Sequence, residues 1–361
     1  MDFKRVTDYM GSLGALGVAG ADLGVYVKGR EAYRSQVGYA DIEARKPITK
    51  DTLFAIWSMT KVVTCVAALR LLEEGRFTLA DPICDYMPEF REMSLKDGAG
   101  ETVPCKRPIR VVDLFTMSSG FSYEVGADLS GCDDLTEFAA AMSGEALLFE
   151  PGTRWMYGFS HDLLGALIER ISGRKVSDYF RDEVFAPLGM EDTCFLQHLP
   201  AEKAVRLANV YEFDAETRTH AKISHKNWNF ENCGGGLVSS VDDYARFAMA
   251  LCNQGTALNG YRVLGRSTVD LMRTNHLCDA RMKDYWLPGY GYGLGVRTHL
   301  DGALSGMNAS VGEYGWAGYL GTYFAVDPAI GLTYVYAQQL SPSMENVIAP
   351  RLKNVIYGCV T

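Results

Sequence analysis

The chain has 361 residues and a formal net charge of -9 at pH 7, with 48% hydrophobic and 22% charged residues. This composition is typical of globular proteins and excludes a disordered or fibrous chain, and the length predicts two domains or one large one. The acidic balance argues against a nucleic-acid partner. No stretch approaches the roughly 20 apolar residues of a membrane span, so we expect no membrane partner.

The cysteine and histidine patterns point away from metal and redox chemistry. None of the nine cysteines forms a CxxC pair, and the six histidines include no HExxH motif. Glycine-rich phosphate loops are also missing from the sequence. We therefore expect neither a metal nor a cofactor. Scattered, unpaired cysteines and the lack of an apolar secretory signal at the N-terminus favour a cytoplasmic protein.

Hydrophobic spacing predicts the elements in chain order. A strand pair is expected at Leu23–Val27 and Ala32–Tyr39. The strongest helix is expected over Met59–Glu74, because its apolar side chains recur at helical spacing and Gly75 provides a stop. Further helices are expected at Asp2–Leu13, Val111–Met117, Ser160–Ile171, Val176–Val184, Val241–Leu251 and Ser343–Tyr357, and further strands at Gly291–Thr298, Glu313–Trp316, Thr322–Val326 and Leu332–Gln338.

Both ends of the chain are thus rich in strands, while the middle is mostly helical. This order predicts an α+β fold in which one antiparallel sheet is built from both ends, flanked by terminal helices, with an inserted helical domain. We expect residues 1–80 and 280–361 to form the sheet domain and residues 81–279 to form the inserted domain.

A serine and a lysine three residues apart stand at the start of the strongest helix. In Ser58-Met59-Thr60-Lys61 the two side chains share one face, so the lysine amine reaches the serine hydroxyl. Serine is a poor nucleophile without a neighbouring base, and a neutral lysine would serve if burial or the helix dipole lowers its pKa. The alternative is a helix N-cap with a solvated lysine.

Other serine patterns favour structural roles. A second such tetrapeptide begins at Ser172, but it lies at a helix end, where Gly173 is typical of a C-cap. The adjacent Ser160-His161-Asp162 cannot form a relay, because neighbours on a helix point in different directions. No Gly-x-Ser-x-Gly elbow occurs, which argues against an α/β-hydrolase.

Taken with its surroundings, the Ser58 segment resembles the class C β-lactamase-like serine hydrolases. That group includes family VIII carboxylesterases, D-alanyl-D-alanine carboxypeptidases and some acyltransferases, and the likeness covers most of the chain in order and spacing. It rests on the segments Phe54–Lys61, Leu79–Pro82, Ile109–Gly120, Pro151–Tyr157, Phe185–Met190 and Gly234–Ser240. The resemblance implies a β-lactamase/transpeptidase-like fold.

The resemblance also assigns roles to single residues. Ser58 corresponds to the acylated nucleophile, and Lys61 to its partner base. Tyr157 corresponds to the tyrosine that moves a proton to the leaving group, helped by a nearby lysine ammonium. The backbone N–H groups of Ser58 and Tyr319 correspond to the oxyanion hole. The alternative for Tyr157 is a tyrosine packed in the core.

The third motif and one departure narrow the expected substrate. Trp316-Ala317-Gly318-Tyr319 is closest to the Trp-Gly-Gly of family VIII carboxylesterases, and it lacks the lysine that suits a β-lactam carboxylate. Phe159 stands where β-lactamases often have Asn. Both changes imply a more apolar pocket. We expect substrate contacts from Trp316, Ala317, Gly318, Phe159 and Tyr123, and a lining that includes Phe121 and Tyr292.

The function expected is therefore hydrolysis of a small-molecule carboxylic ester through an acyl-enzyme on Ser58. Acyl transfer, amide or D-peptide cleavage and weak β-lactam hydrolysis on the same fold stay open, as does the oligomeric state. A non-catalytic binding protein is the alternative outside the enzyme class, although a degenerate member would be expected to lose one of Ser58, Lys61 and Tyr157.

Overall fold

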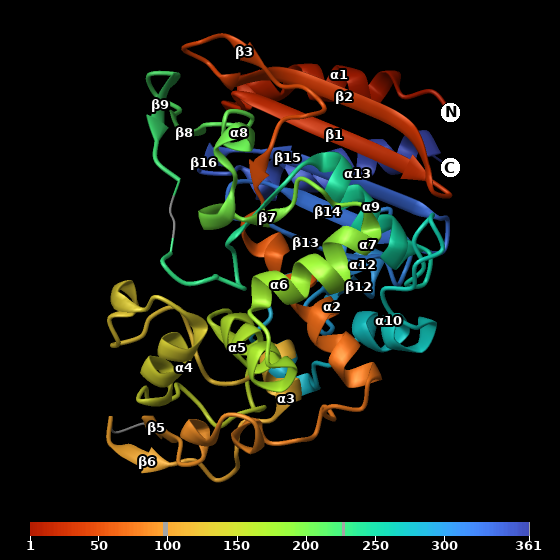
Figure 1. Cartoon of the computed structure of the whole chain (residues 1–361). Coiled ribbons are helices and arrows are strands. Elements are labelled where there is room, and N and C mark those ends of the chain that lie inside the picture. The colour runs from red at the N-terminus through yellow and green to blue at the C-terminus, as the bar shows by residue number, and fades with distance from the viewer. Residues whose placement is uncertain (97–99, 226–227, 361) are drawn as a thin grey trace.

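The computed structural model describes residues 1–96, 100–225 and 228–360 (Figure 1). Its main sheet has eight strands in the order β11-β12-β13-β14-β15-β1-β2-β3, and all neighbours are antiparallel. The strands come from both ends of the chain, as expected. They are β1 (Gly20–Val27), β2 (Arg30–Asp41), β3 (Lys46–Pro47), β11 (Tyr290–Tyr292), β12 (Arg297–His299), β13 (Tyr314–Ala317), β14 (Tyr323–Asp327) and β15 (Leu332–Gln338).

Helices cover both faces of this sheet. The terminal helices α1 (Lys4–Ser12) and α13 (Glu345–Val360) pack on one face, against alternate side chains of β1, β14 and β15 (Figure 1). The opposite face belongs to a larger core, which includes α2 (Thr60–Glu73), α5 (Ser160–Ser172) and α9 (Val241–Cys252). The period-two alternation of the strands therefore fills both layers with apolar side chains.

The remaining elements are short. The helices are α3 (Val111–Phe115), α4 (Leu135–Ser143), α6 (Val176–Phe180), α7 (Ala186–Leu188), α8 (Ala201–Ala204), α10 (Arg266–Arg273), α11 (Asp279–Met282) and α12 (Gly302–Ser305). The strands are β4 (Phe54–Ala55), β5 (Ser94–Lys96), β6 (Thr102–Pro104), β7 (Cys194–Phe195), β8 (Val210–Asp214), β9 (Thr219–Ile223), β10 (Leu237–Ser239) and β16 (Leu340–Ser341). None of the helices in the described part of the chain combines the length and apolar character needed to cross a membrane.

Most predicted elements are confirmed, with one correction in the C-terminal part. The single strand expected over Gly291–Thr298 is a hairpin, β11 and β12, because the chain reverses where the Gly293 N–H donates to Val296 O at 2.7 Å. The division into 1–80 with 280–361 and 81–279 stays a proposal. Within it, α9 belongs to the proposed insert by sequence but packs against the main sheet.

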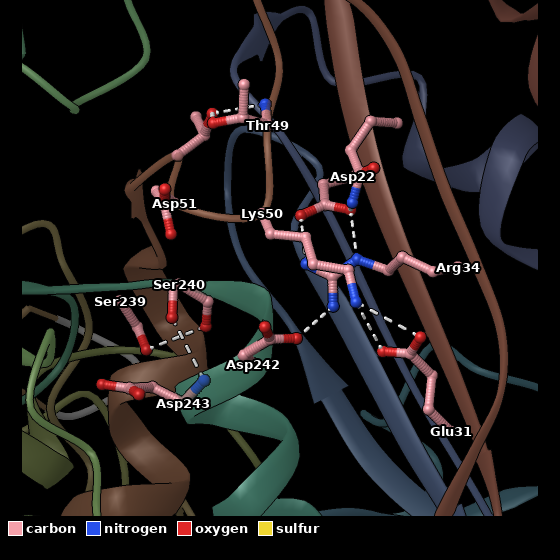
Figure 2. Close-up of polar contacts among 12 residues, drawn as sticks. Asp22, Glu31, Arg34, Thr49, Lys50, Asp51, Ser239, Ser240, Asp242 and Asp243 are labelled. Atoms are coloured by element: carbon pink, nitrogen blue, oxygen red, sulfur yellow. Dashed lines mark hydrogen bonds and ion pairs between the residues drawn. The ribbon is translucent and has the colours of Figure 1, made fainter.

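One buried arginine ties α9 to the sheet. Figure 2 shows the guanidinium of Arg34 between Asp22 on β1 and Asp242 on α9. The Arg34–Asp22 ion pair measures 2.6 Å, and both side chains are buried. Because breaking a buried pair leaves an uncompensated charge, this contact fixes the position of α9 against β1 and β2.

Candidate active site

Ser58 lies in a single 3₁₀ turn, Trp57–Met59, between β4 and α2. Trp57 has φ of +47°, in the left-handed region that a bulky residue seldom adopts and that costs about 1–3 kcal/mol. This sharp turn brings Ser58 to the wall of a cavity while α2 runs into the core. The Ser58 side chain makes no capping hydrogen bond, so the N-cap alternative is wrong.

Lys61 follows one helical turn later and is fully buried, which excludes a solvated lysine. Its Nζ donates to Ser58 Oγ at 3.2 Å, to Tyr123 Oη at 2.9 Å and to the carbonyl oxygen of Gly234. An ammonium group has three donor protons, and here each finds one acceptor. The amine is thereby fixed in position beside the serine hydroxyl.

The charge state of Lys61 differs from the sequence-based expectation of a neutral amine. Burial lowers the pKa of Lys61, but the phenols of Tyr123 and Tyr157 and the Asp162 carboxylate outweigh it and hold the pKa above the ordinary lysine value. Lys61 is therefore an ammonium at neutral pH.

Asp162 is the acidic neighbour that the sequence did not reveal. It is fully buried in the first turn of α5, and its Oδ1 accepts the Gly234 N–H at 2.9 Å. A Cβ at position 234 would lie 2.5 Å from Asp162 Oδ2 and 3.2 Å from Lys61 Nζ, so only glycine fits between them. Burial raises the pKa of Asp162 to about 6, and Lys61 partly offsets that rise.

Tyr157 presents its phenol to the same site. Trp316 Nε1 donates to Tyr157 Oη at 3.2 Å, and Lys61 Nζ lies 4.8 Å from the centre of the Tyr157 ring. Tyr123 packs edge-on against Tyr157, with ring centres 5.7 Å apart. Burial raises the pKa of Tyr123 to about 12, although Lys61 opposes this, so Tyr123 is a neutral phenol at neutral pH. Lys61, Tyr123, Tyr157 and Trp316 therefore meet at one site, although they come from separate segments of the chain.

The end of β13 packs closely against the segment that precedes Ser58. A Cβ on Gly318 would lie 2.3 Å from Ile56 O, and Thr322 Oγ1 donates to the same oxygen at 3.0 Å. Within the described residues, neither the Ser58 nor the Tyr319 backbone N–H donates to an acceptor. Two free donors at such a junction have the character of an oxyanion hole.

A cavity of about 380 Å³ opens beside Ser58. Tyr157 and all four residues of the third motif, Trp316 to Tyr319, lie in its lining. Phe159, Phe121 and Tyr292 are buried behind this lining and take no part in it. Tyr123 is likewise outside the lining, although its hydroxyl reaches Lys61. No cluster of three or more potential metal-ligating side chains occurs among the residues that the structure describes.

Sequence reasoning missed three residues of this site, Asp162, Trp286 and Arg297. Asp162 was set aside because the adjacent His161 made the letters look like a false triad, although a carboxylate among apolar helix positions signals a buried charge. Trp286 and Arg297 line the cavity from segments that carry no recognisable motif. Ser172 behaves as expected, since Gly173 ends α5 with φ of +70°.

Comparison with known proteins identifies the family of the chain. The family model described as Beta-lactamase matches residues 4–356. The chain belongs to the beta-lactamase family. Its resemblance to family VIII-like esterases and its β-lactamase/transpeptidase-like fold are thereby confirmed.

The relatives of this beta-lactamase family member include an esterase. Protein Rv1367c of Mycobacterium tuberculosis is 34% identical over 336 residues, which cover 86% of this chain and 83% of that protein. Esterase EstB of Burkholderia gladioli is 28% identical over 364 residues, with 91% and 88% covered. The solved structure of EstCE1, a hydrolase with promiscuous acyltransferase activity, matches with a TM-score of 0.84 at 23% identity, covering 98% of both chains.

Proposed function

We propose that this chain is a carboxylesterase that cleaves small-molecule esters through an acyl-enzyme on Ser58. The observation that carries the proposal is the contact between the buried Lys61 ammonium and Ser58 Oγ at 3.2 Å, beside the Tyr157 phenol. A purely structural role for Lys61 would not require a serine hydroxyl at the wall of the cavity. The esterase relatives support the same reaction class.

Because Lys61 carries a proton, Tyr157 takes the role of base in the proposed mechanism. The oxygen of Tyr157 accepts the Ser58 proton, with the Lys61 ammonium 4.8 Å from the centre of the Tyr157 ring and the Trp316 N–H donating to that oxygen. Ser58 Oγ bonds to the ester carbonyl carbon, and the bond from that carbon to the alcohol oxygen breaks. Tyr157 returns the proton to the alcohol, and then activates a water that releases the acid and frees Ser58.

The negative oxygen of each tetrahedral intermediate would lie between the backbone N–H groups of Ser58 and Tyr319. Both donors are free of other acceptors in the described chain, which supports this role. By analogy with other acyl-transfer enzymes, each donor is worth about 3–4 kcal/mol of transition-state stabilisation. Trp316, Ala317 and Gly318 would form the adjoining wall of the substrate site.

The first prediction tests the nucleophile directly. Ser58→Ala removes the attacking oxygen, so turnover of short-chain p-nitrophenyl esters should fall to the background rate while circular dichroism stays unchanged. Intact-mass spectrometry should detect the acyl adduct in the native protein and map it to Ser58.

Ser172→Ala is the matched control, because Ser172 also precedes a lysine by three residues but lies at the end of α5, where its Oγ accepts the Arg174 N–H. It should keep full turnover. Retained hydrolysis in Ser58→Ala would refute the proposal.

Acyl transfer to an alcohol is a second candidate function, favoured by the fold similarity to EstCE1, a hydrolase with promiscuous acyltransferase activity. It differs from hydrolysis only in the acceptor that meets the acyl-enzyme. Product analysis with competing alcohols separates the two. Amide, D-peptide and β-lactam substrates belong in the same panel of assays. Failure of a fluorophosphonate probe to label Ser58 would favour a non-catalytic binding protein.

The nine free thiols support our further proposal of a cytoplasmic location.

A further inference from the structure

The two backbone donors of the proposed oxyanion site lie on separate segments of the chain. One is the N–H of Ser58, in the turn Trp57–Met59 before α2, and the other is the N–H of Tyr319, just after β13. To stabilise a tetrahedral intermediate, both nitrogens have to lie about 2.7–3.1 Å from the same oxygen. The order of the chain does not set the distance between them, so contacts across the junction have to do so.

The segment that carries Tyr319 is a tight turn between β13 and β14. The Gly318 N–H donates to Thr322 O at 2.7 Å, and the Gly321 N–H donates to Gly318 O at 2.9 Å. Gly321 has φ of +93°, and a Cβ at this position would lie 2.1 Å from Gln338 Nε2 at the end of β15. The turn is therefore held both by its own hydrogen bonds and by close packing against a neighbouring strand.

Thr322 joins this turn to the segment that carries Ser58. It is fully buried, and its backbone oxygen accepts the Gly318 N–H while its Oγ1 donates to Ile56 O at 3.0 Å. Ile56 lies two residues before Ser58, and Gly318 lies one residue before Tyr319. A single side chain and its own backbone thus contact the chain next to both donors.

The hydroxyl contact lies at the base of a strained turn. Ile56 O also accepts the Met59 N–H at 3.1 Å, which closes the turn around Ser58, and Trp57 inside it has φ of +47°. A carbonyl oxygen has two lone pairs, so it can accept both donors at once. A turn of this kind keeps its shape only when its surroundings support it, and the Thr322 hydroxyl provides such a contact.

We propose that Thr322 is a positioning residue, which holds the Ser58 and Tyr319 N–H groups at the separation that an oxyanion requires. This inference rests on the proposed function, because it concerns the oxyanion site of the same reaction. Thr322 lies outside the lining of the cavity of about 380 Å³, so we expect it to make no contact with the substrate. It acts through the Ile56 carbonyl and the Gly318 N–H, and loss of its hydroxyl would let the two donors move apart.

Thr322→Val tests this role, because valine keeps the branched shape and removes the hydroxyl donor. We expect kcat/KM for p-nitrophenyl acetate to fall by about tenfold or more, since complete loss of an oxyanion donor costs about a hundredfold to a thousandfold. Thr322→Ala should show the same fall without placing a methyl group against Ile56 O, and it replaces the valine variant if that protein does not fold. Thr322→Ser keeps the donor and should stay within about threefold of the native value. A native kcat/KM in a folded variant without the hydroxyl would overturn the proposal.

Thr298→Val is the matched control. Thr298 is also a buried threonine, and its Oγ1 donates to a carbonyl distant in the chain, that of Arg273, at 2.6 Å. This bond joins β12 to the end of α10 rather than the two segments of the oxyanion site. In denaturant unfolding Thr298→Val should lose stability as Thr322→Val does, while its kcat/KM should equal the native value. An equal fall of kcat/KM in both variants would show a general packing effect and overturn the positioning role.

A sulfur substrate distinguishes the oxyanion site from general damage to the fold. p-Nitrophenyl thionoacetate has sulfur in place of the carbonyl oxygen, and sulfur is a weak acceptor that gains little from the two N–H donors. The native enzyme should prefer the oxygen ester in kcat/KM. This preference should shrink several fold in Thr322→Val and stay unchanged in Thr298→Val, and an unchanged preference in Thr322→Val would contradict the proposal.

Labelling by a fluorophosphonate separates this inference from the proposed function. Ser58 Oγ bonds to phosphorus, fluoride leaves with the serine proton, and the phosphoryl oxygen occupies the oxyanion site, so no ester turnover is needed. A labelling rate that falls in Thr322→Val but returns in Thr322→Ser, in a protein without ester turnover, would refute the esterase and keep the positioning role. Ester turnover and labelling that are both independent of Thr322 would refute the positioning role alone. Absence of both reactions in the native protein would overturn both proposals.

Discussion

At the scale of single residues, the charge on Lys61 decides how the site works. The amine is buried one turn from the serine, an environment that by itself favours the neutral base expected from sequence. Tyr123, Tyr157 and the Asp162 carboxylate reverse this direction, so the positive charge is kept at a buried position. An ammonium cannot accept the serine proton, so the proposed mechanism gives the role of base to Tyr157.

In the proposed mechanism Asp162 would act through Lys61, as a positioning residue. Since its pKa is about 6, it loses its proton as the pH rises through that value and then supports the Lys61 charge. We predict that kcat/KM for a neutral ester rises with pH through about 6. Asp162→Asn should lose this inflection and lower kcat/KM at pH 7 by about tenfold or more.

Asp243→Asn is the matched control for this pH profile. Burial also raises the pKa of Asp243 to about 6, but its carboxylate binds the Asp192 N–H and Thr193 at the start of α9, away from Lys61. Its pH–rate profile should keep the inflection. The positioning role of Asp162 would be contradicted by an unchanged profile in Asp162→Asn.

At the scale of elements, the proposed oxyanion site lies at the junction of β13 with the turn before α2. The strand can approach this turn only because position 318 has no side chain. We predict that Gly318→Ala separates the two backbones, lowering kcat for ester hydrolysis by about a hundredfold and the free energy of unfolding by about 1–3 kcal/mol. Steady-state kinetics and denaturant unfolding measure the two effects.

Gly358→Ala in α13 is the comparison variant, because a Cβ there meets nothing within 4 Å. It should leave kcat unchanged and raise the free energy of unfolding by about 0.5–1 kcal/mol, since alanine favours a helix. If Gly318→Ala behaved in the same way, the close approach at β13 would have no part in catalysis.

At the scale of the whole molecule, the ionisation of Asp162 should cost stability. Its pKa rises from 3.8 to about 6 on folding, so between these values the folded state holds a proton that the unfolded state has lost. The contribution of Asp162 to stability is therefore present below about pH 4 and is lost as the pH rises through about 6. The loss amounts to about 1–3 kcal/mol.

We predict that native protein loses this amount of unfolding free energy relative to Asp162→Asn between pH 4 and pH 6, because asparagine stays neutral throughout. Urea unfolding of both proteins at a series of pH values measures the difference. The expected direction is opposite to that of the activity, which rises over the same range. A constant difference between the two proteins would show that the pKa of Asp162 is not raised on folding.

The sequence by itself determined the fold class and the helix that carries Ser58 and Lys61, because periodicity and spacing along one element are local properties. Leu332–Gln338 and the two-strand pair at the N-terminus were predictable for the same reason. The family resemblance, carried by several motifs in order, also identified Tyr157 and Trp316 as candidate site residues. The hairpin at β11 and β12 was missed, because glycine alternates with larger residues through the tight turn as it does along the strands.

Only the tertiary structure decided the electrostatics and the shape of the cavity. The distance from Asp162 to Lys61 depends on how α5 packs against α2, and the place of Arg297 in the cavity lining depends on how β12 pairs with β13. Phe159 was expected at the substrate but packs in the core behind it. Charges and packing act through space between elements distant in the chain, so neither the pKa of a lysine nor the lining of a pocket is encoded in local spacing.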